Sequence, residues 1–510
     1  MIDSVMHLAL IGHDYKYAVE QTLLTLFPDL RPQYGDLPKL PDVSTVSAAR
    51  INLSHGALYS SATTILCYKG TRYRRTKRVK TPNPTDRLAW DRAMQKIIKL
   101  SFYHAARQAL VDAGNPPPWG AFSGIRPGKV ATALLEAGNT PQQIRRKLVR
   151  EYDVSESRAA LCINTATAGL AVKSTLRARD VCLYINIPFC PTRCAYCSFV
   201  SNAVEKSLHL IEPFLAVLTR EIAAVAAIQR QLNLRIRAVY IGGGTPTTLT
   251  AARLDRMMGM IAKQFDLSAV QEYTVEAGRV DTIDCAKLEI MRKYGVTRVC
   301  INPQSFEPHV QTAIGRRHTA AEIANAVLLA RAAGISQINM DLIAGLPTDT
   351  AAGFARSLAR ALSLEVDNIT IHTLSLKRGS RINEHTKNKA AIPPQLPVTE
   401  TVSQMLDTAQ EKLTDAGFMP YYLYRQKFIA GGFENVGWAK PGAENFYNIA
   451  MMEELCTILA LGAGGVTKLV NPDTGQIERI FNPKFPYEYI ERCDKILEGK
   501  QAILEWEYYQ

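Results

Sequence analysis

The chain has 510 residues, of which 47% are hydrophobic and 21% charged, and 60 Lys and Arg against 47 Asp and Glu give it a formal net charge of +13. This length and composition predict a globular protein of two or three domains, and the positive charge favours acidic partners. The sequence excludes a membrane-spanning helix, because it has no run of about 18 uncharged apolar residues, and its ten cysteines are too scattered for a disulfide framework.

The sequence favours a cytoplasmic location. The first residues, Met1 to His7, lack the basic segment of a signal peptide. The cysteines outside one close group of three stand mostly in apolar runs, which is typical of buried thiols in a reducing compartment. They are Cys67, Cys162, Cys182, Cys285, Cys300, Cys456 and Cys493.

Residues 1–175 are predicted to form an N-terminal α+β domain that carries no catalytic signature. A strand is expected over 58–68, and a long amphipathic helix over 86–113 is ended by a Gly-Asn-Pro-Pro-Pro segment. Two further helices are expected at about 130–149 and 155–172.

Two segments of this domain leave a functional alternative open. The basic run 69–80 is typical of a solvated strand end or loop, with a contact to nucleic acid or substrate as the alternative. The turn-rich loop 119–129 carries aromatic residues and two cations. It is typical of a packed connector, with a cap over an active site as the alternative.

From residue 176 to 376 strands and helices alternate. Strands are expected at 181–188, 238–241, 272–276, 298–301, 337–343 and 368–374, and helices within 206–231 and near 251–265, 284–293, 307–314, 320–333 and 350–364. This alternation predicts a parallel sheet with right-handed crossovers. Because no Gly-x-Gly-x-x-Gly segment opens a helix, the α/β fold is predicted to be a partial (βα)6 barrel of the TIM type rather than a doubly wound sheet.

A loop with three cysteines follows the first of these strands. Cys190, Cys194 and Cys197 form a Cys-x3-Cys-x2-Cys pattern at the carboxyl end of the strand, where barrels place their functional residues. A structural zinc site normally takes four protein ligands. Three thiolates suit a [4Fe–4S] cluster in which one iron has no protein ligand and is free to bind a substrate or cofactor.

Glycines and polar residues follow the later strands. Gly242-Gly-Gly-Thr-Pro246 follows the second strand, and its glycines would let the backbone approach a ligand closely, with a tight turn as the alternative. A carboxylate inside an apolar strand, such as Asp341, is costly unless it is paired. Each polar residue alone is typical of a structural partner, but their common position at one rim favours a ligand site. The further candidates are Glu276, Gln304, Ser305, Arg316 and His318.

Residues 377–510 are predicted to form a C-terminal α+β extension. A polar linker that ends at Pro393-Pro394 is followed by an amphipathic helix over 399–416 and a strand over 421–427. The aromatic and glycine-rich segments beyond it indicate either a surface shaped around something flat or an irregular lobe with tyrosines in its core. These segments are 431–438, 445–448 and 461–465.

The order of these motifs resembles that of the radical S-adenosylmethionine (SAM) enzymes. Tyr-Ile-x-Ile-Pro-Phe-Cys, Val-Tyr-Ile-Gly-Gly-Gly-Thr-Pro-Thr and Asp-Leu-Ile-x-Gly-Leu-Pro narrow the resemblance to the oxygen-independent coproporphyrinogen III oxidase (HemN-like) family. Gly124-Ile-Arg-Pro127 and the segment 424–454 are similar to its HemZ-type branch. The resemblance is strong over 180–510 and includes the first 175 residues through this branch.

This resemblance implies that Cys190, Cys194 and Cys197 hold the cluster and that its fourth iron chelates the amino and carboxylate groups of SAM. Asp341 and Glu276 would suit hydroxyl and ammonium groups of the cofactor, and Arg316 would suit its carboxylate. The family's cofactor-contact positions correspond to Tyr184, Tyr196, Gly243, Gly244, Thr245, Glu276, Gln304, Arg316, Asp341 and Ile343.

The implied reaction is the oxidative decarboxylation of coproporphyrinogen III propionates to vinyl groups, which gives protoporphyrinogen IX in heme biosynthesis. The reduced cluster would cleave SAM, and the 5′-deoxyadenosyl radical would take a hydrogen from a propionate. This tetracarboxylate substrate agrees with the positive charge of the chain. A flavodoxin or ferredoxin is expected as the electron donor, and a nucleic-acid partner is not expected.

One position departs from the family pattern. Established oxidases have a fourth cysteine two positions after the third, where this chain has Phe199. The same Cys-x-Phe pattern occurs in related heme chaperones, which bind heme. A heme chaperone and another tetrapyrrole-modifying radical SAM enzyme are therefore the alternatives, and tRNA modification through the run 69–80 is disfavoured. The long N-terminal domain and the segment 424–454 favour the oxidase.

Overall fold

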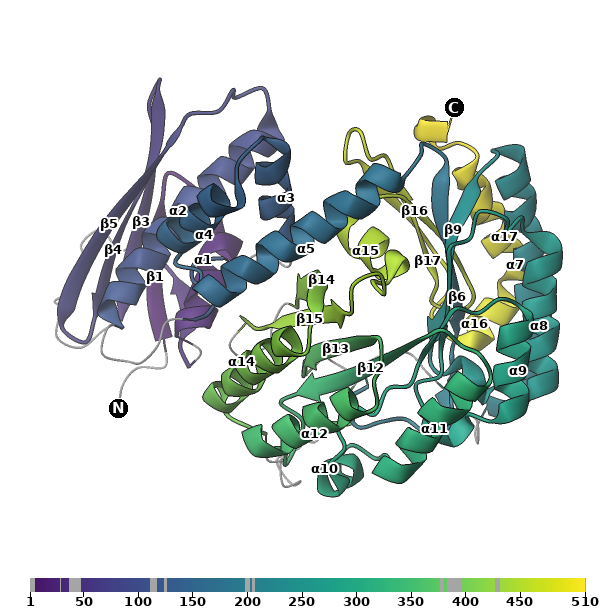
Figure 1. Ribbon diagram of the computed structural model, residues 1–510. Helices are drawn as coiled ribbons and strands as arrows, with labels where there is room; N and C mark the ends of the chain where they lie inside the picture. Colours follow the sequence, from purple (N-terminus) through teal and green to yellow (C-terminus); the bar gives the residue numbers. More distant parts are fainter. Residues whose placement is uncertain are drawn as a thin grey trace. The chain divides into compact units, whose positions relative to one another are not determined.

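The chain folds into two compact units, shown as a ribbon in Figure 1. The computed structural model describes residues 5–27, 29–35, 47–110, 117–122, 126–197, 202–203, 207–376, 380–382, 396–426 and 432–509. The first unit comprises Met1–Pro127, Ala133–Ile163 and Arg425–Phe433, and the second comprises Gly128–Thr132, Asn164–Tyr424 and Glu434–Gln510. The predicted division at 175/176 and 376/377 stays a prediction.

Some predicted features lie outside the described residues. Phe199 lies outside them, and so do residues 427–431 of the segment 424–454. The Gly-Ile-Arg-Pro loop and the linker before Pro394 lie partly outside. In the part of the chain that the structure describes, no helix is both long enough and apolar enough to cross a membrane.

The first unit is built on a five-stranded sheet with helices on one face. Its strand order is β2 (Arg31–Tyr34), β1 (Val5–Ile11), β3 (Ala48–His55), β4 (Tyr59–Tyr68) and β5 (Thr71–Lys80). Alternate residues of the strands, such as Leu8, Ile51 and Leu66, pack against the helices α1 (Lys16–Leu26) and α2 (Arg87–Ala109). The expected strand over 58–68 is confirmed, and so is a helix within 86–113, although α2 ends at Ala109 and residues 111–113 lie outside the described residues. Most of the basic run 69–80, expected as a strand end or loop, forms the edge strand β5.

Three helices follow in the chain: α3 (Gly128–Glu136), α4 (Pro141–Tyr152) and α5 (Glu156–Thr175). The expectation of one helix over 130–149 is wrong. Gly138 has φ +82 and ends α3, because this conformation suits glycine after a helix. Thr140 and Gln143 then form a capping box that starts α4, with Pro141 at its first position.

The second unit contains the partial barrel that the sequence predicts. Its six central strands run parallel and lie side by side in chain order, and the connecting helices lie along the outer face of the sheet (Figure 1). The strands are β6 (Asp180–Ile187), β9 (Arg235–Gly243), β10 (Glu272–Glu276), β11 (Arg298–Cys300), β12 (Gln337–Ala344) and β13 (Asn368–Thr373). The connecting helices are α7 (Ile211–Gln231), α8 (Ala251–Gln264), α9 (Cys285–Lys293), α10 (Pro308–Ala313), α11 (Ala320–Ala332) and α12 (Ala351–Ser363).

Strands from the last third of the chain extend the same sheet at both edges. At one edge β16 pairs in parallel with β6 and is followed by β17 and β18, and at the other β15 runs antiparallel to β13 with β14 beside it. These elements are α14 (Thr399–Asp415), β14 (Met419–Arg425), β15 (Glu434–Ala439), α15 (Phe446–Glu453), β16 (Thr457–Leu461), β17 (Val466–Val470), β18 (Ile477–Phe481), α16 (Pro486–Glu491) and α17 (Cys493–Lys500).

Burial decides several of the sequence alternatives. Trp119 and Phe122 are buried, so the described part of the loop 119–129 is a packed connector. Tyr421 and Tyr422 are core residues, which supports the lobe with a tyrosine core. Cys285 is exposed, contrary to expectation, because it lies at the start of α9; the other six cysteines expected to be buried are buried.

The two faces of the barrel strands differ in chemistry. Leu183, Ile185 and Ile187 of β6 are fully buried, whereas Tyr184 and Asn186 alternate with them and face the other side of the sheet. The same alternation gives this inner face a largely polar lining, whereas a (βα)8 barrel normally packs its interior with branched apolar side chains. The inner face therefore has the composition of a ligand site. Its polar residues include Tyr240, Thr274, Glu276, Arg298, Asn339, Asp341, Thr370 and His372.

Candidate functional site

The cysteine loop begins directly where β6 ends. Phe189–Cys190 (β7) pairs with Asn202–Ala203 (β8), and the amide of Cys197 donates to the carbonyl of Cys194 at 3.2 Å. Cys194 is buried, whereas Cys190 and Cys197 are partly exposed. The amide of Ala195 donates to Ile314 O at 3.0 Å, which ties the loop to the residue after α10.

The glycine loop after β9 lies against the cysteine loop. The amide of Gly244 donates to Ile187 O at 2.8 Å, and Thr245 donates to Phe189 O at 2.7 Å. Thr245 Oγ1 also lies 3.5 Å from Cys190 Sγ. A Cβ on Gly244 would stand 2.5 Å from Phe189 O and 3.0 Å from Cys190 Sγ, so glycine is needed for this close approach. The backbone that Gly244 approaches is the cysteine loop itself, which the sequence did not predict.

Arg316 is buried beside the cysteine loop. It donates to Tyr196 Oη at 3.1 Å, to Gly278 O at 3.2 Å and to Asn302 O. Burial alone would raise the pKa of the Cys194 thiol, but the charge of Arg316 and its hydrogen bond outweigh this effect and lower that pKa. A lowered pKa favours the thiolate, which is the form that binds a metal.

Arg279 holds the cysteine loop at a second residue. It donates to Thr192 Oγ1 at 2.9 Å and is paired with Asp281 at 2.8 Å. Its charge also helps to lower the pKa of Cys194.

Three other predicted positions meet between β12 and the segment after β11. Tyr196 and Ile343 share one apolar cluster with Val310 and Ile314. Gln304 has φ +69, its amide donates to Asp341 O at 2.9 Å, and its carbonyl accepts from the amide of Ile343 at 3.0 Å. Its side-chain Oε1 is buried and has no hydrogen-bond partner among the described residues, so it is available to a polar ligand.

Two carboxylates lie on the inner face of the barrel. Glu276 accepts from Asn302 Nδ2 at 3.0 Å and from Tyr240 Oη. Burial raises the pKa of Glu276 to about 7, and the neighbouring charge of Asp341 adds to this effect. A cationic ligand would favour the ionised form of Glu276, so the group suits the ammonium group of an amino acid.

Asp341 is paired, as its position inside a strand requires. It accepts from Asn339 Nδ2 at 2.9 Å, and its other oxygen lies 3.5 Å from His372 Nε2. Burial alone would lower the pKa of His372, but Asp341 raises it above its ordinary value.

Three tyrosine rings lie beside these polar groups. Tyr447 stacks on Tyr240 with ring centroids 4.5 Å apart and on Tyr184 at 5.9 Å. Tyr184 Oη donates to Asn186 Oδ1 at 2.9 Å, which fixes its ring. The rings of Tyr184 and Tyr240 come from neighbouring barrel strands, whereas Tyr447 comes from α15.

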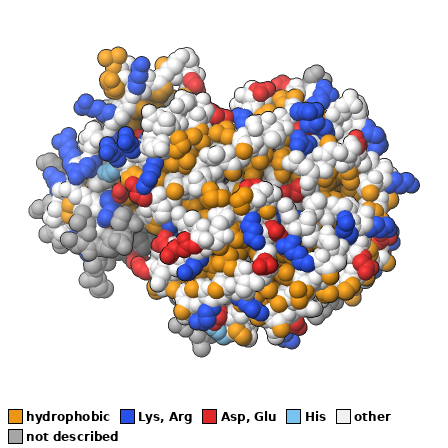
Figure 2. Space-filling model, in the orientation of Figure 1, with side chains coloured by type: hydrophobic (Ala, Val, Ile, Leu, Met, Phe, Trp, Pro, Cys, Tyr) orange, Lys and Arg blue, Asp and Glu red, His pale blue; other side chains and the backbone are white. Residues whose placement is uncertain are grey.

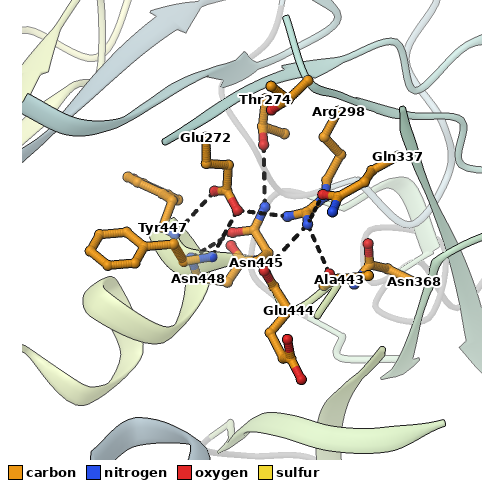
Figure 3. Close-up of polar contacts among 12 residues, drawn as sticks. Glu272, Thr274, Arg298, Gln337, Asn368, Ala443, Glu444, Asn445, Tyr447 and Asn448 are labelled. Atoms are coloured by element: carbon orange, nitrogen blue, oxygen red, sulfur yellow. Dashed lines mark hydrogen bonds and ion pairs between the residues drawn. The ribbon is translucent and has the colours of Figure 1, made fainter. Parts of the chain in front are cut away.

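A buried polar network holds α15 in this place (Figure 3). Glu272 accepts from the amides of Phe446 and Tyr447 at 2.8 and 3.1 Å, and Arg298 donates to Glu272 at 2.9 Å. Arg298 also donates to Ala443 O at 2.8 Å. Asn445 caps the helix and donates from Nδ2 to Thr274 Oγ1 at 3.2 Å. Side chains of β10 and β11 thus hold the start of α15 in place.

Sequence reasoning missed several residues of this site. His372 carries a local signal, since it is a polar residue in the apolar strand 368–374 at the same end as the other candidates. Tyr240 stands within the Val-Tyr-Ile-Gly motif, and Asn302 follows the fourth strand. Tyr447 lies in the aromatic segment 445–448, but the sequence does not indicate that it reaches this site, because it does so only when α15 folds back onto distant strands.

The donor set fits an iron–sulfur cluster. In the described ranges no three His, Cys, Asp or Glu side chains are grouped so as to hold one metal ion. In a [4Fe–4S] cluster each thiolate binds a different iron, so the ligands need not converge as those of one ion do. The three thiols of one loop, the lowered pKa of Cys194 and the two arginines beside them fit such a cluster.

Comparison with known proteins finds a family match and similar proteins of two kinds. The Radical SAM superfamily profile matches residues 184–361. The oxygen-independent coproporphyrinogen-III oxidase-like protein HemZ of Bacillus subtilis is 40% identical over 395 residues, which cover 77% of this chain and 78% of HemZ. The heme chaperone HemW of Haemophilus influenzae is 30% identical, and the match covers 63% of this chain and 78% of HemW.

A solved structure has the same fold. The structure of coproporphyrinogen III oxidase (HemN) from Escherichia coli, described as a radical SAM enzyme, matches with a TM-score of 0.52 and 23% identity, over 65% of this chain and 73% of HemN. This match confirms the predicted partial-barrel α/β fold.

Replacing Gly244 with alanine is expected to displace the cysteine loop, because the added Cβ would stand 2.5 Å from Phe189 O. Overpacking of this kind costs about 1–3 kcal/mol. We expect Gly244→Ala to lose most of the iron that the wild-type chain holds after anaerobic reconstitution, measured as iron and sulfide per chain. Gly499→Ala is the control, since the atom nearest its Cβ, in Ile480, is 3.9 Å away. Equal iron in both variants would contradict the role of Gly244.

The raised pKa of Glu276 predicts a pH dependence of stability. Its pKa is about 7 in the folded chain against an ordinary value of 4.5, so the folded state holds one more proton than the unfolded state between these values. The free energy of unfolding of the apoprotein should therefore fall as the pH rises through this window, by at most about 1.4 kcal/mol per pH unit. Urea unfolding of Glu276→Gln should show a smaller fall. The exposed control Glu289→Gln should behave as wild type, and an unchanged fall in Glu276→Gln would refute the assignment.

Proposed function

The chain belongs to the radical SAM superfamily and, within it, to the family of oxygen-independent coproporphyrinogen III oxidase-like proteins, and from this premise we propose that it converts propionate groups of coproporphyrinogen III to vinyl groups, which gives protoporphyrinogen IX. As a radical SAM protein it uses a [4Fe–4S] cluster and SAM. The observation that carries the proposal is the polar inner face of the barrel, which adjoins the cysteine loop and bears Glu276 and Asp341.

We assign the cluster to Cys190, Cys194 and Cys197. When bound, the cluster and SAM together supply the reductive cleavage that yields a radical able to abstract hydrogen from the substrate. Arg316 and Arg279 lower the pKa of Cys194 and so favour the thiolate form that would bind iron. Their hydrogen bonds to Tyr196 and to Thr192 hold the loop in place.

We assign the SAM contacts to the residues that surround this loop. Glu276 would bind the ammonium group of SAM, since a cation favours its ionised form. Asp341 and Gln304 would accept from hydroxyl groups, and Gln304 Oε1 is free to do so among the described residues. Arg316 would meet the carboxylate. The remaining assigned contacts are Tyr184, Tyr196, Gly243, Gly244, Thr245 and Ile343.

The oxidase proposal rests on the relatives as well as on the site. HemZ shares 40% identity over 77% of this chain, whereas HemW shares 30% over 63%. The HemW match and Phe199, which lies outside the described residues, favour delivery of heme as a second candidate function. A tetrapyrrole is the ligand in both, and a flavodoxin or ferredoxin would supply electrons to the oxidase.

We also propose roles for the parts of the chain. The segment 176–376 would bind the cofactors, and 377–510 would cover the substrate, because its strands β14, β15 and β16 flank the barrel strands in one sheet. The cytoplasmic location stays a prediction.

Anaerobic incubation with coproporphyrinogen III, SAM and a reductant tests this function. We expect 5′-deoxyadenosine and a vinyl product, both lost in Cys194→Ala and both kept in Cys285→Ala, whose cysteine is exposed outside the loop. Tight heme binding without product would favour the chaperone and overturn the oxidase. A Cys194→Ala protein that kept its iron and SAM cleavage would refute the cluster assignment.

A further inference from the structure

The sheet of the first unit has one face that the described helices leave open. On β5, Tyr73 and Val79 pack against the core on the side of α1 and α2. Arg72, Arg74 and Arg78 have the opposite parity in the strand and are exposed. Their side chains therefore stand on the open face.

Strand register extends this face across β4 and β3. Thr76 lies opposite Thr63, and their hydroxyl oxygens are 2.9 Å apart, which places both side chains on the same side. The hydroxyl oxygens of Ser54 and Ser61 are also 2.9 Å apart, one strand pair further on. We name this surface the basic sheet face, formed by Arg50, Arg72, Arg74, Thr76, Arg78 and Lys80.

The charge of this face is not balanced within the sheet. No strand residue of β1 to β5 is an aspartate or glutamate. In the described part of the chain, none of the salt bridges involves Arg72, Arg74, Arg78 or Lys80. Lys and Arg side chains are correspondingly prominent over the region of β4 and β5 (Figure 2). The face therefore carries a net positive field that a polyanion would meet.

The pattern of this face suits phosphates. Alternate residues of an antiparallel strand stand about 7 Å apart, so the cations form a regular row. Arg, Lys, Ser, Thr and Asn side chains are the usual donors to the nucleic-acid backbone. Tyr59, opposite Lys80, is the one tyrosine, tryptophan or phenylalanine on this face of the described strands, so stacking on bases has little support.

Contrary to the expectation from the sequence, we propose that the basic sheet face binds nucleic acid through its phosphate backbone, without sequence specificity. An acidic protein is the less favoured partner, because protein interfaces centre on buried apolar and aromatic side chains, and on this face of β4 and β5 the cations and hydroxyl groups outnumber the apolar side chains of Ile65 and Cys67. The activity is separate from the radical chemistry and goes beyond the proposed function.

Fluorescence anisotropy of the full chain with labelled single-stranded RNA and DNA of two unrelated sequences tests the proposal. We expect equal affinity for both sequences and weakening by at least about tenfold in the triple variant Arg72→Gln, Arg74→Gln, Arg78→Gln. The loss of three phosphate contacts should also reduce the salt dependence, the slope of log K on log salt, by about 2. Both RNA and DNA are used because both carry the phosphate backbone that the face is proposed to contact.

The control removes the same charge elsewhere in the first unit. Arg146, Lys147 and Arg150 are exposed on α4, and their triple replacement by glutamine should leave binding close to wild type. Equal weakening by both triples, or binding of an acidic flavodoxin probe but of neither nucleic acid, would overturn the proposal. The charge-preserving variant Arg72→Lys, Arg74→Lys, Arg78→Lys should retain binding, which keeps the test valid if the glutamine triple does not fold. SAM cleavage should be unchanged in all of them.

Discussion

The buried ion pair between Glu272 and Arg298 is the contact on which the inner face of the barrel depends. The two side chains are 6% and 1% exposed, and such a pair is favourable only when its other donors and acceptors are satisfied. The amides at the start of α15 and the carbonyl of Ala443 satisfy most of them, whereas Arg298 Nε has no hydrogen-bond partner among the described residues. The same bonds place Tyr447 against Tyr240. Loss of either partner would leave a buried charge and free the helix that carries this ring.

The register of the strands sets the order of the groups on the inner face. Glu272 precedes Glu276 by four residues on β10, so the network that anchors α15 and the acidic group of the site lie at opposite ends of one strand. The rings of Tyr184 and Tyr240 lie on the neighbouring strands β6 and β9, and the cysteine and glycine loops follow those strands directly. One sheet therefore brings together thiols, carboxylates and aromatic rings that are far apart in the sequence. Burial of polar and charged groups without a ligand costs free energy. The raised pKa of Glu276 is a consequence of this burial.

The central strands and the position of the cysteine loop could be predicted because their signals are local. Short apolar runs ended by glycine or polar residues give the strands, and three close cysteines give the loop. The break at Gly138 carried local stop and start signals that the predicted helix 130–149 overlooked. Long-range pairings had no such signal: β16 joins β6 across more than half of the chain, and Tyr447 meets Tyr184 only in the folded state. The basic run 69–80 was visible, but which side chains share one open face depends on register with β4.

We propose that one loop of three cysteines holds a cluster beside a SAM site lined by Glu276 and Asp341. Electron paramagnetic resonance of the anaerobically reconstituted and reduced chain, recorded with and without SAM, tests it most directly. We expect the signal of a reduced [4Fe–4S] cluster that changes when SAM is added, because the iron without a protein ligand would bind the cofactor. A signal that SAM leaves unchanged, or one that persists when Cys190, Cys194 and Cys197 are all replaced by serine, would contradict the account.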